Sequence, residues 1–188
     1  MELILVRHAL PLRSDTSADP GLSRVGHEQS ARLARTLARQ RFDALYSSPM
    51  RRALETAEPL RALLATHTTE DERLSEFNRH DGAYVPVEEL KRADRKAWEA
   101  LRDGAGVDME AFRADVVSAI DAIIAAHPGG SVLVFCHGGV INSWASHVLG
   151  LPAKLFFAPD YTSVHRFQCS RAGHRSLVSL NDSAHLRD

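Results

Sequence analysis

The chain has 188 residues, of which 44% are hydrophobic and 25% are charged, and its formal net charge is −1. This length suits one domain whose core needs no disulfide bonds or metals to be stable. The near-zero net charge argues against a nucleic-acid protein that depends on overall positive charge, and no apolar run is long enough to span a membrane. We therefore expect a single domain, residues 1–188, with neither nucleic acid nor membrane as a partner.

Cysteine and histidine usage indicates the compartment and argues against a metal site. Two cysteines, Cys136 and Cys169, are too few for a disulfide framework, and no signal peptide is visible at the N-terminus. The ten histidines are scattered and lack metal-ligand spacing. We expect a cytoplasmic protein with no metal and no cofactor.

The strongest strand signal comes first in the chain. Residues 3–6 are a continuous apolar run, typical of a strand that is buried on both faces, and Arg7 and His8 follow it directly. Ligands bind at the carboxyl ends of strands in open α/β sheets, so we expect Arg7 and His8 at the mouth of a crevice. Residues 9–22 contain prolines and a glycine and should form a loop at the wall of this pocket.

Two helices are predicted next, with a strand between them. Ser23 is a candidate N-cap for a helix that runs to about residue 40, and residues 42–47 form a short strand. Ser48 and Pro49 are expected to be the N-cap and first residue of a helix that ends near residue 65. This helix begins with Arg51 and Arg52, so cations and free backbone N–H groups should meet at a natural anion site.

The rest of the chain is less regular until a second strong strand. Residues 68–71 are a candidate strand. Residues 74–106 are expected to be an irregular insertion that contributes to a substrate pocket and contains a helix at 87–101. A helix at 107–127 precedes the apolar strand 131–136, which runs directly into His137, Gly138 and Gly139. A helix follows at 140–149, then an antiparallel hairpin of strands 164–169 and 176–180, and a frayed tail at 181–188. His165 is expected on the surface.

The alternation of strands and helices predicts an α/β three-layer sandwich. Its central sheet should be mostly parallel with an antiparallel edge, and helices should cover both faces. If strands 3–6 and 131–136 lie side by side and parallel, the imidazoles of His8 and His137 face one pocket. With the guanidinium groups of Arg7 and Arg52 they would form a strongly cationic site. A phosphoryl group fits such a site, because guanidinium groups bind its oxygens bidentately.

Several segments resemble the histidine phosphatase superfamily, which has the phosphoglycerate-mutase-like fold. Residues 5–9 (Leu-Val-Arg-His-Ala) resemble the Arg-His-Gly signature of this family, and residues 22–29 resemble its Leu-Thr-x-x-Gly-x-x-Gln segment. Residues 46–57 resemble its Ser-x-x-x-Arg-Ala-x-x-Thr-Ala block, in which Arg52 rather than Arg51 precedes Ala53. Residues 134–141 resemble its second-histidine motif. The matches run from residue 3 to about residue 152 in the order of the family.

The resemblance implies a role for each candidate. His8 would be the nucleophile that forms a phosphohistidine, and Arg7, Arg52 and His137 would hold the phosphoryl oxygens. Residues 74–76 (Leu-Ser-Glu) resemble a Leu-x-Glu motif, which makes Glu76 the candidate general acid. Ser14 and Gly138 are further candidates for phosphate contact, with Ser14 standing where the mutase branch often has Asn.

The resulting interpretation is a metal-independent phosphomonoesterase of the histidine acid phosphatase type, acting on a small-molecule or protein phosphomonoester. Two alternatives are a phosphoglycerate-type mutase and a phospho-ligand binding protein that has lost turnover. The short chain and the presence of Leu10, where the mutase branch commonly has an acidic residue, favour the phosphatase branch. The sequence does not specify the natural substrate or the oligomeric state.

Overall fold

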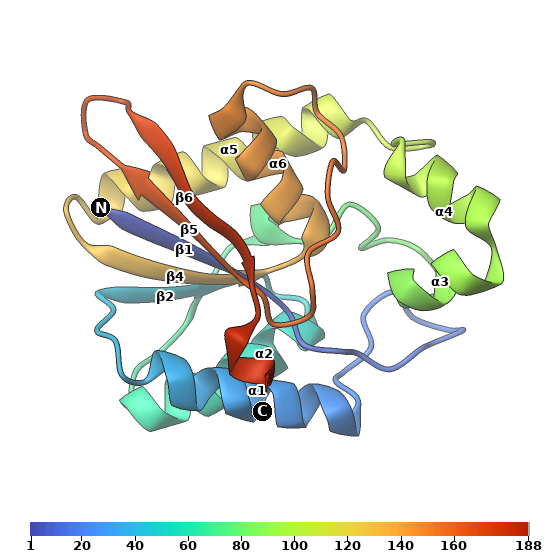
Figure 1. Cartoon of the computed structure of the whole chain (residues 1–188), viewed down its shortest axis with the longest axis horizontal. Helices are drawn as coiled ribbons and strands as arrows, with labels where there is room; N and C mark the ends of the chain where they lie inside the picture. The colour runs from blue at the N-terminus through green and yellow to red at the C-terminus, as the bar shows by residue number, and fades with distance from the viewer. Residues whose placement is uncertain (188) are drawn as a thin grey trace.

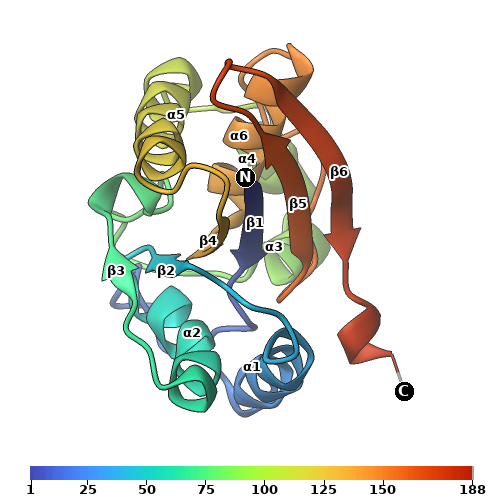
Figure 2. The same cartoon turned by 90° about the vertical axis from the view of Figure 1, so that its left-hand side faces the viewer.

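A computed structural model describes residues 1–187 and contains one six-stranded sheet with helices packed against it (Figures 1 and 2). The strands are β1 (Glu2–Arg7), β2 (Ala44–Ser47), β3 (Thr69–Glu70), β4 (Ser131–Cys136), β5 (Val164–Cys169) and β6 (Arg175–Asp182). The helices are α1 (Arg24–Leu37), α2 (Arg51–Leu64), α3 (Val87–Ala93), α4 (Arg95–Arg102), α5 (Met109–Ala126) and α6 (Gly138–Leu149), with short 3₁₀ turns η1 (Glu72–Leu74) and η2 (Ala184–Leu186). No helix within residues 1–187 is both long and apolar enough to cross a membrane.

The strand order is β3-β2-β4-β1-β5-β6, which places the two histidine-bearing strands at the centre. β1 and β4 pair in parallel from the pair Glu2–Ser131 to the pair Arg7–Cys136. β2 and β3 extend the parallel part, whereas β5 runs antiparallel to β1, and β6 antiparallel to β5. The predicted mostly parallel sheet with an antiparallel edge is confirmed.

Side-chain alternation along β1 explains why both faces of the sheet are covered. Leu3 and Leu5 pack in a core with α5 and α6, whereas Ile4 and Val6 pack in a second core with α1 and α2. Figure 2 shows these two helix pairs on opposite sides of the central strands. Because the apolar run of β1 has no polar side, both faces of the sheet must be covered by helices, and the three layers follow.

The predicted helix starts are correct for α1 and shifted for α2. Ser23 caps α1, and its Oγ accepts a hydrogen bond of 3.0 Å from the Gly26 N–H. Ser48 does not cap α2, because the backbone continues extended through Met50 and the helix begins at Arg51. The Ser48 hydroxyl instead accepts from the Met50 N–H and pairs with the ring of His137.

Two further expectations for the chain are wrong. The helix expected at 87–101 is two helices, because Asp94 is extended and its carboxylate caps α4 by accepting from the Ala97 N–H. The tail expected to fray is ordered over residues 181–187. Asn181 accepts a hydrogen bond of 2.6 Å from the Asp160 N–H, and His185 pairs with the hydroxyl of Thr162, while residue 188 lies outside the described residues.

Candidate active site

The site begins where β1 and β4 end at the same edge of the sheet. His8 follows β1 and His137 follows β4, and the His8 N–H donates to the Cys136 carbonyl at 2.9 Å. The centroids of the two imidazole rings lie 5.2 Å apart, with 57° between the ring planes. Both rings are buried. The structure therefore brings together the two histidines that are 129 positions apart in the sequence.

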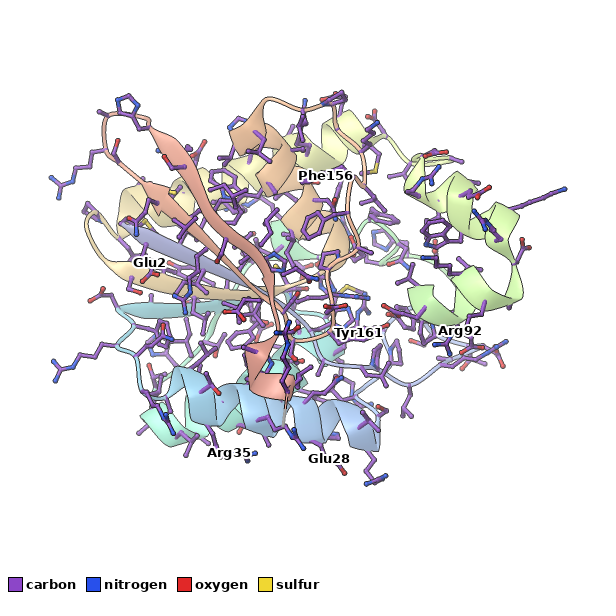
Figure 3. All side chains as sticks on the ribbon, in the orientation of Figure 1. Glu2, Glu28, Arg35, Arg92, Phe156 and Tyr161 are labelled. Carbon is purple, nitrogen blue, oxygen red and sulfur yellow. The ribbon has the colours of Figure 1, made fainter. Side chains whose placement is uncertain are left out.

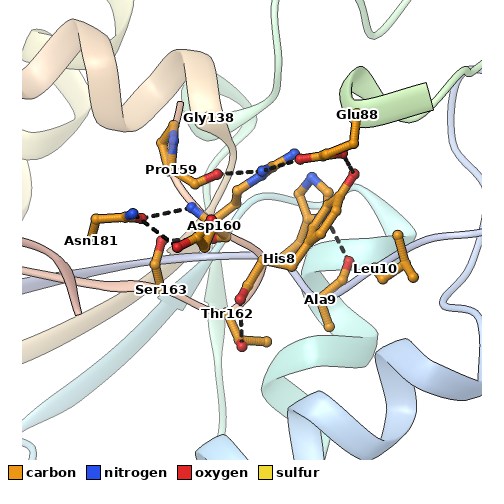
Figure 4. Close-up of polar contacts among 12 residues, drawn as sticks. His8, Ala9, Leu10, Glu88, Gly138, Pro159, Asp160, Thr162, Ser163 and Asn181 are labelled. Carbon is orange, nitrogen blue, oxygen red and sulfur yellow. Dashed lines mark hydrogen bonds and ion pairs between the residues drawn. The ribbon is translucent and has the colours of Figure 1, made fainter. Parts of the chain in front are cut away.

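The hydrogen bond of His8 determines which ring nitrogen is free. Its Nδ1 lies 2.8 Å from the Ala9 carbonyl oxygen (Figure 4), and a carbonyl can only accept, so Nδ1 carries the proton. Nε2 then holds the lone pair. Burial, followed by the charges of Arg52 and Arg7, keeps the His8 pKa well below its ordinary value. His8 is thus a neutral imidazole with an available nitrogen, which is what a nucleophile requires.

His137 is fully buried next to His8, and it is not among the residues that bound the cavity. Its Nε2 lies 2.8 Å from the Ser48 hydroxyl, and its Nδ1 has no hydrogen-bond partner among the described residues. Burial, then the charge of Arg52, lowers its pKa well below the ordinary value. A buried nitrogen with no protein partner is rare in native structures, and it marks a position suited to contact with a ligand.

Arg7 lies between an aromatic ring and a backbone carbonyl. Its Cζ is 3.9 Å from the centroid of the Tyr161 ring, and its Nη1 donates to the Pro159 carbonyl and, at 3.2 Å, to Glu88 (Figure 4). Its buried Nε has no hydrogen-bond partner in residues 1–187. Stacking and the carbonyl bond fix the plane of the guanidinium group, so the unpaired Nε–H is already oriented.

Arg52 is fully buried at the first turn of α2, whereas Arg51 is exposed and pairs with Glu55. Its Nη1 donates to the Ala18 carbonyl at 3.0 Å, and an ion pair of 3.5 Å links it to Asp19. Neither Nε nor Nη2 finds a hydrogen-bond partner in the described part of the chain. A buried guanidinium with two free donors is costly unless an anion completes it.

Glu76 lies two residues after η1 and lines the same cavity as His8. Its Oε2 accepts from the Gly139 N–H at 3.0 Å and its Oε1 from the Phe77 N–H at 3.1 Å. Burial raises the pKa of this carboxyl, against the opposing effects of the Gly139 N–H and Arg52. A carboxyl with a raised pKa can hold a proton and release it, as a general acid must.

Side chains from the motif segments fix the backbone that follows His8. The Ala9 N–H donates to the Thr56 hydroxyl at 2.9 Å, and the Leu10 N–H donates to the Gln29 side chain at 2.9 Å. A Cβ on Gly26 would lie 2.1 Å from the Leu10 carbonyl oxygen, so this close approach requires glycine. These contacts hold the backbone directly after His8 in one conformation.

The predicted site residues divide into those that line one cavity and those that do not. A cavity of about 360 Å³ is bounded by Arg7, His8, Arg52, Glu76 and Gly138 together with loop and α3–α4 residues. Ser14 is not among the residues that line it. Backbone hydrogen bonds of 2.7 and 3.0 Å pair Ser14 with Tyr84 instead. No group of three His, Cys, Asp or Glu side chains in residues 1–187 is arranged to hold a metal ion.

Comparison with known proteins now identifies the family. The family model "Histidine phosphatase superfamily (branch 1)" matches residues 3–183. The chain belongs to this superfamily.

Several known proteins are similar to this chain over nearly its whole length. A putative phosphoserine phosphatase 2 of Hydrogenobacter thermophilus is 26% identical, over 98% of this chain and 97% of its own length. Phosphoglycerate mutase-like protein 4 of Arabidopsis thaliana is 27% identical, over 100% of this chain and 87% of its own. A phosphoserine phosphatase from Entamoeba histolytica has a similar fold, with a TM-score of 0.79 at 22% identity over 98% of both chains.

This member of the histidine phosphatase superfamily has site residues that sequence reasoning missed. Tyr161 stacks on Arg7, and its hydroxyl donates to Glu88 at 2.5 Å. Thr162 next to it has a left-handed backbone (φ 59°), and its N–H donates to the carbonyls of Arg7 and His8. A β-branched residue in this conformation is strained, and such strain is typical of functional sites. Nothing in the sequence around these residues indicates their position.

His165, expected on the surface, is fully buried. Its Nδ1 accepts from the Asn181 N–H at 3.2 Å, so Nε2 carries the proton and donates to the Ser163 hydroxyl at 2.9 Å. Ser163 in turn donates to the Asp160 carbonyl. Because both ring nitrogens are satisfied, the buried imidazole is stable only in its neutral form. Burial, then the charge of Arg7, lowers its pKa to about 3.

Proposed function

We propose that this chain hydrolyses phosphomonoesters through a phosphohistidine formed on His8. The observation that carries the proposal is the arrangement of His8, Arg7 and Arg52. A neutral imidazole with a free Nε2 adjoins two guanidinium groups whose unpaired donors are buried. Such donors stabilise the charge that spreads over phosphoryl oxygens in the transition state.

In the first step, Nε2 of His8 attacks phosphorus and the bond from phosphorus to the leaving oxygen breaks. Arg7, Arg52 and His137 hold the non-bridging oxygens, and the Gly138 backbone at the start of α6 adds a donor at a positive helix end. Glu76 gives its proton to the leaving alkoxide. The products are an alcohol, a phosphorylated His8 that keeps its Nδ1 proton on the Ala9 carbonyl, and a Glu76 carboxylate.

In the second step, the Glu76 carboxylate takes a proton from a water molecule as the water oxygen attacks phosphorus. The bond from phosphorus to Nε2 breaks, inorganic phosphate leaves, and His8 returns to its neutral form. One carboxyl thus acts as acid and then as base, as its raised pKa allows. Uncatalysed phosphate-monoester hydrolysis is extremely slow, so most of the acceleration must come from the oriented cations.

The names of the relatives support a reaction on phosphate esters. Hydrolysis and phosphoryl transfer within the substrate, as in a mutase, are then separated by experiment. Curated relatives carry the names phosphoserine phosphatase and probable phosphoglycerate mutase.

Purified protein should release inorganic phosphate from p-nitrophenyl phosphate and from 3-phosphoglycerate, without accumulation of the isomeric phosphoglycerate. His8→Ala should abolish this release. Turnover of ³²P-labelled substrate, quenched in detergent at alkaline pH, should trap label that is stable in alkali and lost in acid on the wild-type chain only. Full activity of His8→Ala would refute the proposal, and isomerisation without phosphate release would establish the mutase alternative.

A further inference from the structure

The cavity extends well beyond the phosphate end, towards α3 and α4. Its far part is bounded by the segment before α3, by α3 and α4 themselves, and by the loop that follows α6. Figure 1 shows α3 and α4 at the end of the molecule that the central parallel strands point to, and Figure 3 labels Phe156 on the loop after α6. The walls carry mostly apolar side chains: Phe77, Val85, Val87, Trp98, Leu101, Leu155, Phe156 and Phe157.

Contacts with Asn142 and with the core hold the aromatic part of this wall in place. The rings of Phe156 and Phe157 lie 4.9 Å apart, and Asn142 fixes their backbone by accepting from both N–H groups and donating to the Phe157 carbonyl. Phe77 packs edge-on against Phe112 of the core, with 5.7 Å between the ring centroids. The wall is therefore preformed, which lowers the entropic cost of binding an apolar group against it.

The charges around this part of the cavity disfavour a cation. Glu76 is the sole carboxylate among the lining residues in the described part of the chain, and both its oxygens already accept backbone N–H bonds. Lys91 and Arg102 also line the cavity, 4.7 and 5.3 Å from the centroid of the Trp98 ring. An ammonium group on the substrate would thus meet apolar surface and two like charges, with no free counter-ion.

Given the phosphatase function proposed above, we propose that the preferred substrates are phosphomonoesters with an apolar or aromatic, non-cationic leaving group. Small zwitterionic amino-alcohol esters such as phosphoserine are poor substrates in comparison. An apolar leaving group gains affinity by excluding water from the Phe156 and Trp98 wall, whereas an ammonium group loses hydration and gains no partner. A difference of one methylene in such a pocket already changes kcat/KM by roughly 10-fold or more.

The test compares esters whose alcohols ionise similarly, so that chemistry alone does not favour one of them. Steady-state phosphate release is measured for phenylpropyl phosphate, aminopropyl phosphate and phosphoserine. We expect kcat/KM for the phenylpropyl ester to exceed that of the other two at least about tenfold. Trp98→Ala should reduce this ratio several-fold, mainly through the KM of the phenylpropyl ester. The matched control Leu63→Ala removes an exposed side chain of α2 that does not line the cavity, and should leave the ratio unchanged.

The outcomes separate this inference from the function on which it rests. Phosphate release at equal kcat/KM for the three esters, or with phosphoserine preferred, would overturn the substrate class and leave the phosphatase function standing. Preference for the phenylpropyl ester that persists in Trp98→Ala would overturn the assignment of this wall. Absence of phosphate release from every ester would overturn both proposals.

Discussion

The contact between Gly139 and Glu76 allows the general-acid role to be tested without removing the carboxyl. A Cβ on Gly139 would lie 2.1 Å from Oε1 of Glu76 and 2.8 Å from the Phe77 ring. Ordinary contacts are more than 3 Å, so Gly139→Ala must displace the carboxyl by about 1 Å. Misplacement on this scale can cost about 10²-fold in rate. We therefore expect kcat/KM on alkyl phosphates, which reports only the step that forms the phosphohistidine, to fall about 10²-fold.

The assay compares an alkyl phosphate with p-nitrophenyl phosphate, whose leaving group needs little protonation. Gly139→Ala should affect the aryl ester much less than the alkyl ester. Gly82→Ala is the control, because its Cβ would meet no atom of residues 1–187 within 4 Å and Gly82 does not line the cavity. Circular dichroism and Tm of both variants establish that the fold is retained. A kcat/KM for the alkyl ester within about threefold of the wild type would refute the assigned acid role of Glu76, as would equal losses of kcat/KM on both esters.

Four other predictions test separate parts of the site. Glu76→Gln should lower kcat/KM, which reports only the formation of the phosphohistidine, by about 10²-fold or more for alkyl esters and less for p-nitrophenyl phosphate, and equal losses in kcat/KM would show that another group is the acid. Chelators should leave the rate unchanged, because the guanidinium groups supply the positive charge, and a loss restored by zinc or magnesium would contradict this expectation. Asn142→Ala should raise KM for apolar esters more than it lowers kcat, since it frees the Phe156 and Phe157 backbone, and a change in kcat alone would refute this positioning role. His165 has an ordinary pKa of 6.5 and a folded-state pKa of about 3, so the unfolded chain binds the extra proton. Stability should therefore fall by roughly 1.4 kcal/mol per pH unit as the pH drops below 6.5 towards 3, and denaturant titrations of His165→Gln should show a shallower slope.

The central strands could be predicted because their apolar runs are unbroken. Leu3–Val6 and the strand before His137 have no polar face, so each must be covered on both sides, and parallel pairing then aligns their carboxyl ends. The juxtaposition of the two imidazoles follows from that alignment alone. Arg52 was also predictable, since it precedes Ala53 in the motif and a helix start exposes N–H groups.

The sequence prediction was wrong at Asp94 and at His165, because neither residue type by itself determines the role that the residue takes in the structure. Asp94 interrupts the expected helix at 87–101 as the N-cap of α4, a signal that is present in its residue type. His165 lies in the correctly predicted strand β5, where alternation places it on the face opposite Val164. The loop that contains Ser163 covers this face and supplies its hydrogen bond, so the imidazole is buried. No local pattern indicates that a loop will cover a polar side chain.

The two halves of the cavity differ in how the chain builds them. The phosphate half stands on strand ends and helix starts, where backbone geometry fixes each side chain and the sequence pattern shows the positions. The other half is formed by α3, α4 and the loop that carries Tyr161. Glu88 of α3 and Tyr161 contact Arg7 from 81 and 154 positions away in the sequence. These contacts depend on loop conformation and strain, as the φ of Thr162 shows, rather than on periodicity. Substitutions of Trp98 and Leu101 in α4 are therefore expected to change the leaving group that the proposed phosphatase accepts, while the histidines and guanidinium groups stay in place.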